Sequence, residues 1–216
     1  MILSNVISQL LGCMVTSIEI ILLTLLFSLP LGLIIAAGRM SKFTPIRWLM
    51  KIYISIMRGT PLMLQLIVVF FAPYYLFGFS LSADYRFIAV IIAFTINYAA
   101  YFAEIYRGGI EAIPKGQYEA AQVLGYSRFE TFFIIILPQV FKIILPSVTN
   151  EVITLVKDTS LSFVIAIPEM FTVAKQIAAA DASIAALLVA GVFYYVFNII
   201  VAFVMEHLEN RLSYYE

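Results

Sequence analysis

Long uncharged stretches alternate with short charged clusters along this chain. A helix needs about 20 consecutive apolar residues to cross the hydrocarbon core of a bilayer. Four uncharged stretches approach or exceed that length, and a fifth apolar stretch is interrupted by charged side chains. The pattern predicts an all-α integral membrane protein with five transmembrane helices in a single domain, residues 1–216. The predicted spans cover residues 12–38, 58–78, 86–106, 138–158 and 183–206.

The composition agrees with a membrane protein. Hydrophobic residues make up 63% of the chain and charged residues 12%, whereas soluble domains carry about 25% charged residues. The net charge is zero, so an acidic polymer such as nucleic acid is not expected as a partner. Cys13 is the single cysteine and His207 the single histidine. We therefore expect no disulfide, no metal site and no cofactor.

The positions of Lys and Arg predict the orientation, because cytoplasmic loops carry an excess of these residues. They cluster in the connections at residues 39–51 and 107–128, while the opposite side has only Arg86 and Lys175. This predicts a multi-pass protein of the plasma membrane with its N-terminus outside and its C-terminus in the cytoplasm. The first apolar stretch lacks a basic leader and a small-residue cleavage site, so we expect it to be retained as a span.

Proline, glycine and hydroxyl residues mark several predicted helix ends. Thr60 and Pro61 predict a helix start, with Thr60 as the hydroxyl cap and Pro61 at the first helical position. A separate interfacial helix is predicted over residues 45–58, with a break at Gly59. The pair Gly108-Gly109 is predicted to end the third span.

The connection at residues 107–137 is the longest segment between spans that is able to lie in water. Residues 117–124 predict a short helix, and Gly125 is a suitable stop because glycine adopts the left-handed conformation without penalty. Ser127 and Glu130 have the spacing of a capping box, which predicts a second helix that enters the bilayer near Pro138. An ordinary interfacial connection would carry the same local signals.

Four sequence blocks follow one another in this part of the chain. They are Arg58-Gly59-Thr60-Pro61-Leu62 with Gln65, Asn97-Tyr98 with residues 103–110, Glu119-Ala120-Ala121 with Gly125 and Ile135-Ile136-Leu137-Pro138, and Lys157-Asp158-Thr159-Ser160-Leu161. The third block resembles the EAA loop of ABC importer permeases at its usual spacing. The other blocks resemble the polar amino acid branch of that family, which includes permeases for histidine, glutamine and arginine.

The resemblance implies a MetI-like permease architecture, in which the EAA loop is a coupling helix that docks on a separate ABC ATP-binding subunit. The implied coupling residues are Glu119, Ala120, Ala121, Leu124 and Gly125. It also implies a dimer of ATPase subunits, a second permease subunit, identical or related, and an external solute-binding protein. The chain has no phosphate-binding loop motif, so ATP hydrolysis belongs to the partner and this chain is not expected to be an enzyme.

Polar side chains inside predicted spans are costly and usually face a cavity or another polar group. Asn97 lies near the middle of span 86–106, and Asn150 and Glu151 lie near the middle of span 138–158. The predicted substrate-binding residues are Glu151, Asn97, Asn150, Lys157, Asp158, Thr60, Gln65 and Glu19. The alternative role for Glu151 is a buried hydrogen bond between helices.

Two further features accompany these polar residues. Glu104 and Arg107, three residues apart, predict an ion pair on the helix surface. Asp158 with its two hydroxyl neighbours predicts the cap of a short helix over residues 161–167, ended by Pro168. That break would serve either as a gate or as a simple re-entrant turn.

The predicted function is that of a permease subunit in an ATP-driven ABC importer for polar amino acids. Acidic residues outnumber basic ones in the spans, which weakly favours a basic or polar amino acid. The path would open alternately to each side, and a binding protein would deliver substrate near residues 79–86 and 169–182. The alternative is a secondary transporter or channel for small polar solutes, which would run on ion gradients.

Overall fold

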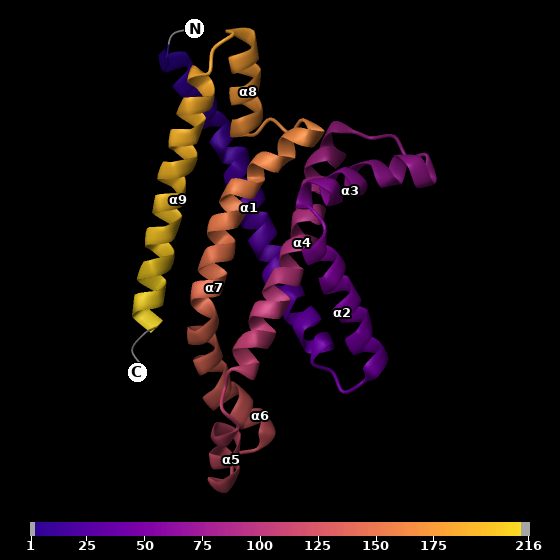
Figure 1. The fold of residues 1–216 in the computed structure, drawn as a ribbon, viewed down its shortest axis with the longest axis vertical. Helices are drawn as coiled ribbons and strands as arrows, with labels where there is room; N and C mark the ends of the chain where they lie inside the picture. The colour runs from indigo at the N-terminus through magenta and orange to yellow at the C-terminus, as the bar shows by residue number, and fades with distance from the viewer. Residues whose placement is uncertain (1–2, 213–216) are drawn as a thin grey trace.

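A computed structural model describes residues 3–212, and over these residues the chain is all helix and turn, with no strand (Figure 1). The long helices are α1 (Leu3–Arg39), α4 (Ala83–Glu111), α7 (Leu137–Asp158) and α9 (Ala185–Leu212). Four helical segments have the length and composition to cross a membrane, and a fifth does if α2 and α3 count as one bent span. The predicted all-α membrane fold is therefore confirmed.

The predicted second span, residues 58–78, corresponds to α3 (Leu62–Phe77), which has only 16 residues. The chain bends by 109° between α2 (Thr44–Gly59) and α3, and α3 points away from the long helices in Figure 1. The helix expected over residues 45–58 is confirmed as α2. The capping prediction for Thr60 is wrong, because its hydroxyl donates backward to the Ile56 carbonyl of α2 at 2.8 Å, and Pro61 occupies the position before α3.

The helix of the third predicted span continues past the two glycines predicted to end it. α4 runs through Gly108 and Gly109 to Glu111. A Cβ on Gly109 would lie 2.2 Å from Cγ2 of Ile144 in α7, whereas a Cβ on Gly108 would meet nothing within 4 Å. Gly109 therefore permits the close approach of α4 and α7 and does not stop the helix.

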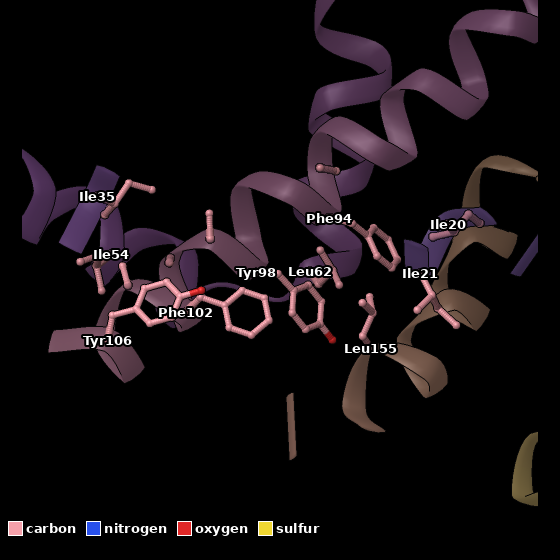
Figure 2. Packing of buried hydrophobic residues seen from close by; sticks show 14 of the residues in the cluster. Ile20, Ile21, Ile35, Ile54, Leu62, Phe94, Tyr98, Phe102, Tyr106 and Leu155 are labelled. Carbon is pink, nitrogen blue, oxygen red and sulfur yellow. The ribbon is translucent and has the colours of Figure 1, made fainter. Parts of the chain in front are cut away.

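α4 is the centre of the main core and packs most extensively on α1. Its residues Phe94, Tyr98, Phe102 and Tyr106 are spaced four apart, so they line one face of the helix. Figure 2 shows these rings among aliphatic side chains from four other helices. Those side chains are Ile20, Ile21 and Ile35 of α1, Ile54 of α2, Leu62 of α3 and Leu155 of α7.

A second core lies at the end of the bundle where α1 and α9 begin, which we call the α8 end. The connection expected to be an external loop contains α8 (Met170–Ala180). Met170, Ala174 and Ile177 have helical spacing and are buried against α1 and α9. The sequence does not predict this helix, because its 11 residues are too few for a membrane span.

Candidate functional site

Three predicted substrate-binding residues meet at the bend between α2 and α3. The Gln65 side-chain nitrogen donates to the carbonyl oxygens of Met57 and Thr60 at 3.0 and 3.1 Å, and to the Thr60 hydroxyl at 2.8 Å. The buried Asn97 amide of α4 donates to the Met57 carbonyl and to Gln65 Oε1, each at 3.0 Å. Backbone carbonyls freed by the bend thus find partners. These amides hold the bend against the middle of α4.

Asp158 ends α7 and faces α4. Its Oδ2 accepts a hydrogen bond of 2.7 Å from the hydroxyl of the buried Tyr98. The chain continues as a 3₁₀ helix, η2 (Thr159–Ile165), so the short helix expected over residues 161–167 starts earlier than predicted. The capping prediction for Asp158 is wrong. Its side chain makes no cap hydrogen bond, and its carboxylate instead accepts the hydrogen bond from Tyr98.

One exposed face of α7 is polar. Ser147, Asn150, Thr154 and Lys157 are exposed and are three or four residues apart, so they form a stripe along the helix. We call these four residues the α7 polar stripe. Glu151 is half-buried beside it. By contrast, the exposed large side chains of α9 between Leu188 and Val204 are apolar except for the hydroxyl of Tyr195. A polar face on a membrane helix requires a polar environment, because lipid cannot supply hydrogen bonds.

A cavity of about 380 Å³ lies between α2, α4 and α7. Arg58, Tyr101, Glu104, Ser147 and Glu151 contribute polar groups to its wall. The Arg58 guanidinium lies 5.1 Å from the centroid of the Tyr101 ring, within cation–π range. The cavity therefore presents carboxylates and a guanidinium together, an arrangement suited to a small molecule with charges of both signs.

Neither Arg58 nor Tyr101 is among the predicted substrate-binding residues. Arg58 had a usable signal, because it is a cation next to an apolar stretch. Tyr101 had no such sequence signal beyond its position one helical turn after Asn97. Glu19 is exposed on α1 and does not line this cavity.

The predicted ion pair between Glu104 and Arg107 is confirmed, with Arg107 Nη2 at 2.6 Å from Glu104 Oε2. Arg107 also pairs with Glu111. Arg39, the last residue of α1, places its Nε 3.9 Å from Glu104 Oε1. These four charged groups connect the ends of α1 and α4 beside the cavity.

The long connection forms a hairpin at the end of the bundle opposite α8 (Figure 1). α5 (Lys115–Val123) is followed by Gly125 with φ +82°, which confirms the predicted left-handed stop. The capping box is also confirmed, since Ser127 Oγ accepts from the Glu130 N–H and Glu130 Oε2 accepts from the Ser127 N–H. The second helix is not separate: α6 (Arg128–Glu130) and the π-helical η1 (Thr131–Ile136) lead directly into α7.

The hairpin exposes apolar side chains at its tip. Val123, Leu124 and Phe129 are 88%, 74% and 72% exposed. Glu119, Ala120 and Gly125 are also exposed, whereas Ala121 is buried. Of the five predicted coupling residues, four are therefore available to a partner, and Ala121 lies in the interior of the hairpin. Large apolar side chains grouped on a protruding surface are typical of a protein interaction site.

Long apolar helices, a polar cavity between them and a protruding hairpin define a membrane transport component. Residues 28–214 match the family model described as the inner membrane component of binding-protein-dependent transport systems. The chain belongs to this family. Membership of this family confirms the resemblance to importer permeases. The chain is therefore a membrane-embedded transport subunit and not an enzyme.

Relatives are similar along nearly the whole chain. The L-cystine transport system permease of Bacillus subtilis (strain 168) is 38% identical over 92% of this chain and 84% of its own length. The arginine transport system permease of the same organism is 37% identical, covering 91% of this chain and 89% of the relative. A glutamate/aspartate import permease of Escherichia coli O157:H7 is 32% identical, covering 94% and 93%.

Solved structures have the same fold. A crystal structure of an amino acid ABC transporter with histidines matches with a TM-score of 0.86 and 29% identity, covering 94% of both chains. An inward-facing form of the MetNI methionine ABC transporter matches with a TM-score of 0.72, covering 97% of this chain and 95% of that one. At 15% identity, the second match supports the MetI-like fold alone.

Proposed function

We propose that this chain imports polar amino acids as one of two permease subunits, driven by ATP hydrolysis in a pair of separate ABC subunits. Residues 1–216 would form a single transmembrane domain with a coupling loop at residues 107–137. The names of the relatives support an amino acid substrate, since they include cystine, arginine and glutamate/aspartate permeases. These substrates differ in charge and size. The kind of amino acid that this protein prefers would therefore depend on the residues of its own binding site.

The charged cavity beside the α7 polar stripe is the observation that carries the proposal. Glu151 reaches the cavity wall from α7, and Arg58 reaches it from α2. Glu104 is already paired with Arg107, so Glu151 is the carboxylate better suited to a substrate ammonium or basic side chain. Arg58 would meet the substrate carboxylate. A volume of about 380 Å³ lies within the usual range of small-molecule sites.

The other predicted substrate-binding residues divide into groups. Asn150 and Lys157 on the α7 polar stripe, with Asp158 at its end, would line the path beyond the cavity. Thr60, Gln65 and Asn97 would shape the path through their hydrogen bonds at the bend. Glu19 lies apart from the cavity, and its proposed contact with substrate would occur elsewhere along α1.

A second permease subunit would cover the α7 polar stripe. Polar side chains in spans face other polar groups or water, so stripes from two subunits would enclose one path. The mostly apolar exposed face of α9 suits lipid. The second subunit is either an identical copy or a related chain.

The hairpin would dock on the ATPase through Glu119, Ala120, Leu124 and Gly125, with Val123 adding apolar surface. This assignment supports a cytoplasmic location for α5, with the N-terminus outside and the C-terminus inside. A solute-binding protein would then approach the opposite end, near residues 79–86 and 169–182.

Transport by the reconstituted complex tests the proposal. Glu151→Gln removes the charge and keeps the shape, so we expect amino acid uptake to fall at least tenfold. Glu206→Gln makes the same change on α9, outside the cavity, and should leave uptake unchanged. Equal uptake by wild type and Glu151→Gln would remove Glu151 from the path. Uptake driven by an ion gradient without nucleotide would favour a secondary transporter instead.

A further inference from the structure

Glu169 is fully buried in the connection between η2 and α8. Its Oε1 accepts hydrogen bonds from the backbone N–H and hydroxyl of Thr172 at 2.6 and 2.8 Å. Its Oε2 accepts from the Phe171 N–H at 2.8 Å and from the Tyr194 hydroxyl at 2.9 Å. Burial raises the pKa of the Glu169 carboxyl, and these hydrogen bonds oppose that effect. All four donors are uncharged.

Three of these hydrogen bonds are local, and one crosses between helices. Phe171 and Thr172 belong to the first turn of α8, where Glu169 satisfies N–H groups that the helix itself leaves unpaired. A serine or aspartate would cap this turn as well, without burying a long carboxylate. The Tyr194 bond is different because it ties the start of α8 to α9.

Tyr194 extends the connection to a third element. Its oxygen lies 3.5 Å from Oγ1 of Thr159, the first residue of η2. Thr159 directly follows Asp158 and the α7 polar stripe. Buried residues continue from there into α8, so η2 and the start of α8 are packed into the bundle directly after this end of the stripe. These buried residues are Thr159, Ser162, Ile165, Ile167, Glu169 and Met170.

We propose that Glu169 is a positioning residue of the transport cycle, which through Tyr194 holds η2 and the start of α8 against α9 and keeps the path closed at the α8 end. The proposal rests on the proposed function as an ATP-driven importer. Alternating access requires this end to open once in each cycle, by movement of packed elements relative to one another. The bond between Glu169 and Tyr194 joins two such elements, whereas the bonds to Phe171 and Thr172 move with α8.

Tyr194→Phe tests this role by removing one oxygen atom. In proteoliposomes that hold the complete complex, we expect ATP hydrolysis without binding protein to rise about three- to tenfold, the factor that loss of one hydrogen bond produces. The stimulation by loaded binding protein should fall correspondingly. Glu169→Gln should act in the same direction. Tyr195→Phe is the matched control, because Tyr195 is 67% exposed on another face of α9.

Cys13, the single cysteine, provides a second measurement. It is partly buried against the α8-end core, so its rate of reaction with N-ethylmaleimide reports loosening there. We expect Tyr194→Phe to raise this rate several-fold and Tyr195→Phe to leave it unchanged. A purely structural cap would instead lower the yield of complex, with the ratio of basal to stimulated hydrolysis per complex unchanged.

The proposal is overturned if assembled Tyr194→Phe complex matches wild type in both basal hydrolysis and Cys13 labelling. If Glu169→Gln does not assemble, Tyr194→Phe decides alone, because it leaves the cap of α8 intact. Both measurements work without amino acid. A wild-type complex that hydrolyses ATP but carries no amino acid would therefore contradict the proposed function and still permit this test.

Discussion

The Tyr98 hydroxyl donates a 2.7 Å hydrogen bond to the Asp158 carboxylate and so links the middle of α4 to the last residue of α7. Tyr98 is 2% exposed, within the row of aromatic rings that forms the core of α4. The position of the α7 polar stripe relative to the core therefore depends on a contact between residues 60 positions apart.

Removal of that hydroxyl should destabilise the protein. Tyr98→Phe leaves a half-buried carboxylate without its donor, and we expect a loss of about 1–3 kcal/mol in unfolding free energy. Thermal unfolding of the purified complex measures it. Tyr75→Phe, at a 76% exposed tyrosine of α3, is the control. In a double-mutant cycle with Asp158→Asn, additive effects would show that the two side chains are not coupled.

The two glycines of α4 should respond oppositely to alanine. Gly109→Ala puts a methyl group 2.2 Å from Ile144 Cγ2, so we expect a loss of about 1–3 kcal/mol from overpacking. Gly108→Ala meets nothing within 4 Å and should be neutral or stabilising by up to about 1 kcal/mol. Melting temperatures of the two variants give the comparison. Partial rescue of Gly109→Ala by Ile144→Ala would identify the steric cause, and equal melting of both glycine variants would refute it.

Asn97 provides a test between a structural role and substrate contact. Asn97→Leu removes two hydrogen bonds at the α2–α3 bend and leaves the Met57 carbonyl and Gln65 with one partner fewer. If the amide only holds the bend, we expect lower stability by about 1–3 kcal/mol and a lower maximal uptake rate per complex, with the same KM. A several-fold rise in KM at unchanged stability would instead indicate direct contact with the amino acid.

Leu124 should contribute strongly to ATPase binding. Leu124→Asp places a charge on an apolar side chain that is 74% exposed at the hairpin tip, so we expect co-purification of the ATPase subunit to fall at least tenfold. Thr44→Asp is the control, because it adds the same charge at the exposed start of α2, which is not part of the hairpin. Normal ATPase recovery with Leu124→Asp would exclude the hairpin tip from the interface.

Local signals in the sequence determined much of the fold. Uncharged stretches identified the long helices because a bilayer excludes charge over a fixed thickness. Gly125 and the pair Ser127 and Glu130 identified the turn of the hairpin, because a left-handed stop and a capping box are formed by neighbouring residues. The ion pair between Glu104 and Arg107 was predictable for the same reason, since one helical turn separates them.

Contacts between distant segments decided the rest. Gly109 is a packing position because Ile144 approaches it from another helix. Thr60 and Asp158 do not cap the helices that follow them, because their hydrogen bonds go back to α2 and across to Tyr98. Arg58 meets Glu151 in one cavity, and Glu169 meets Tyr194, only after the helices pack. Hydrogen bonding and burial depend on distances in three dimensions. Sequence alone therefore determined the long helices and the hairpin turn, and tertiary structure decided how helix ends pack and which polar groups share a site.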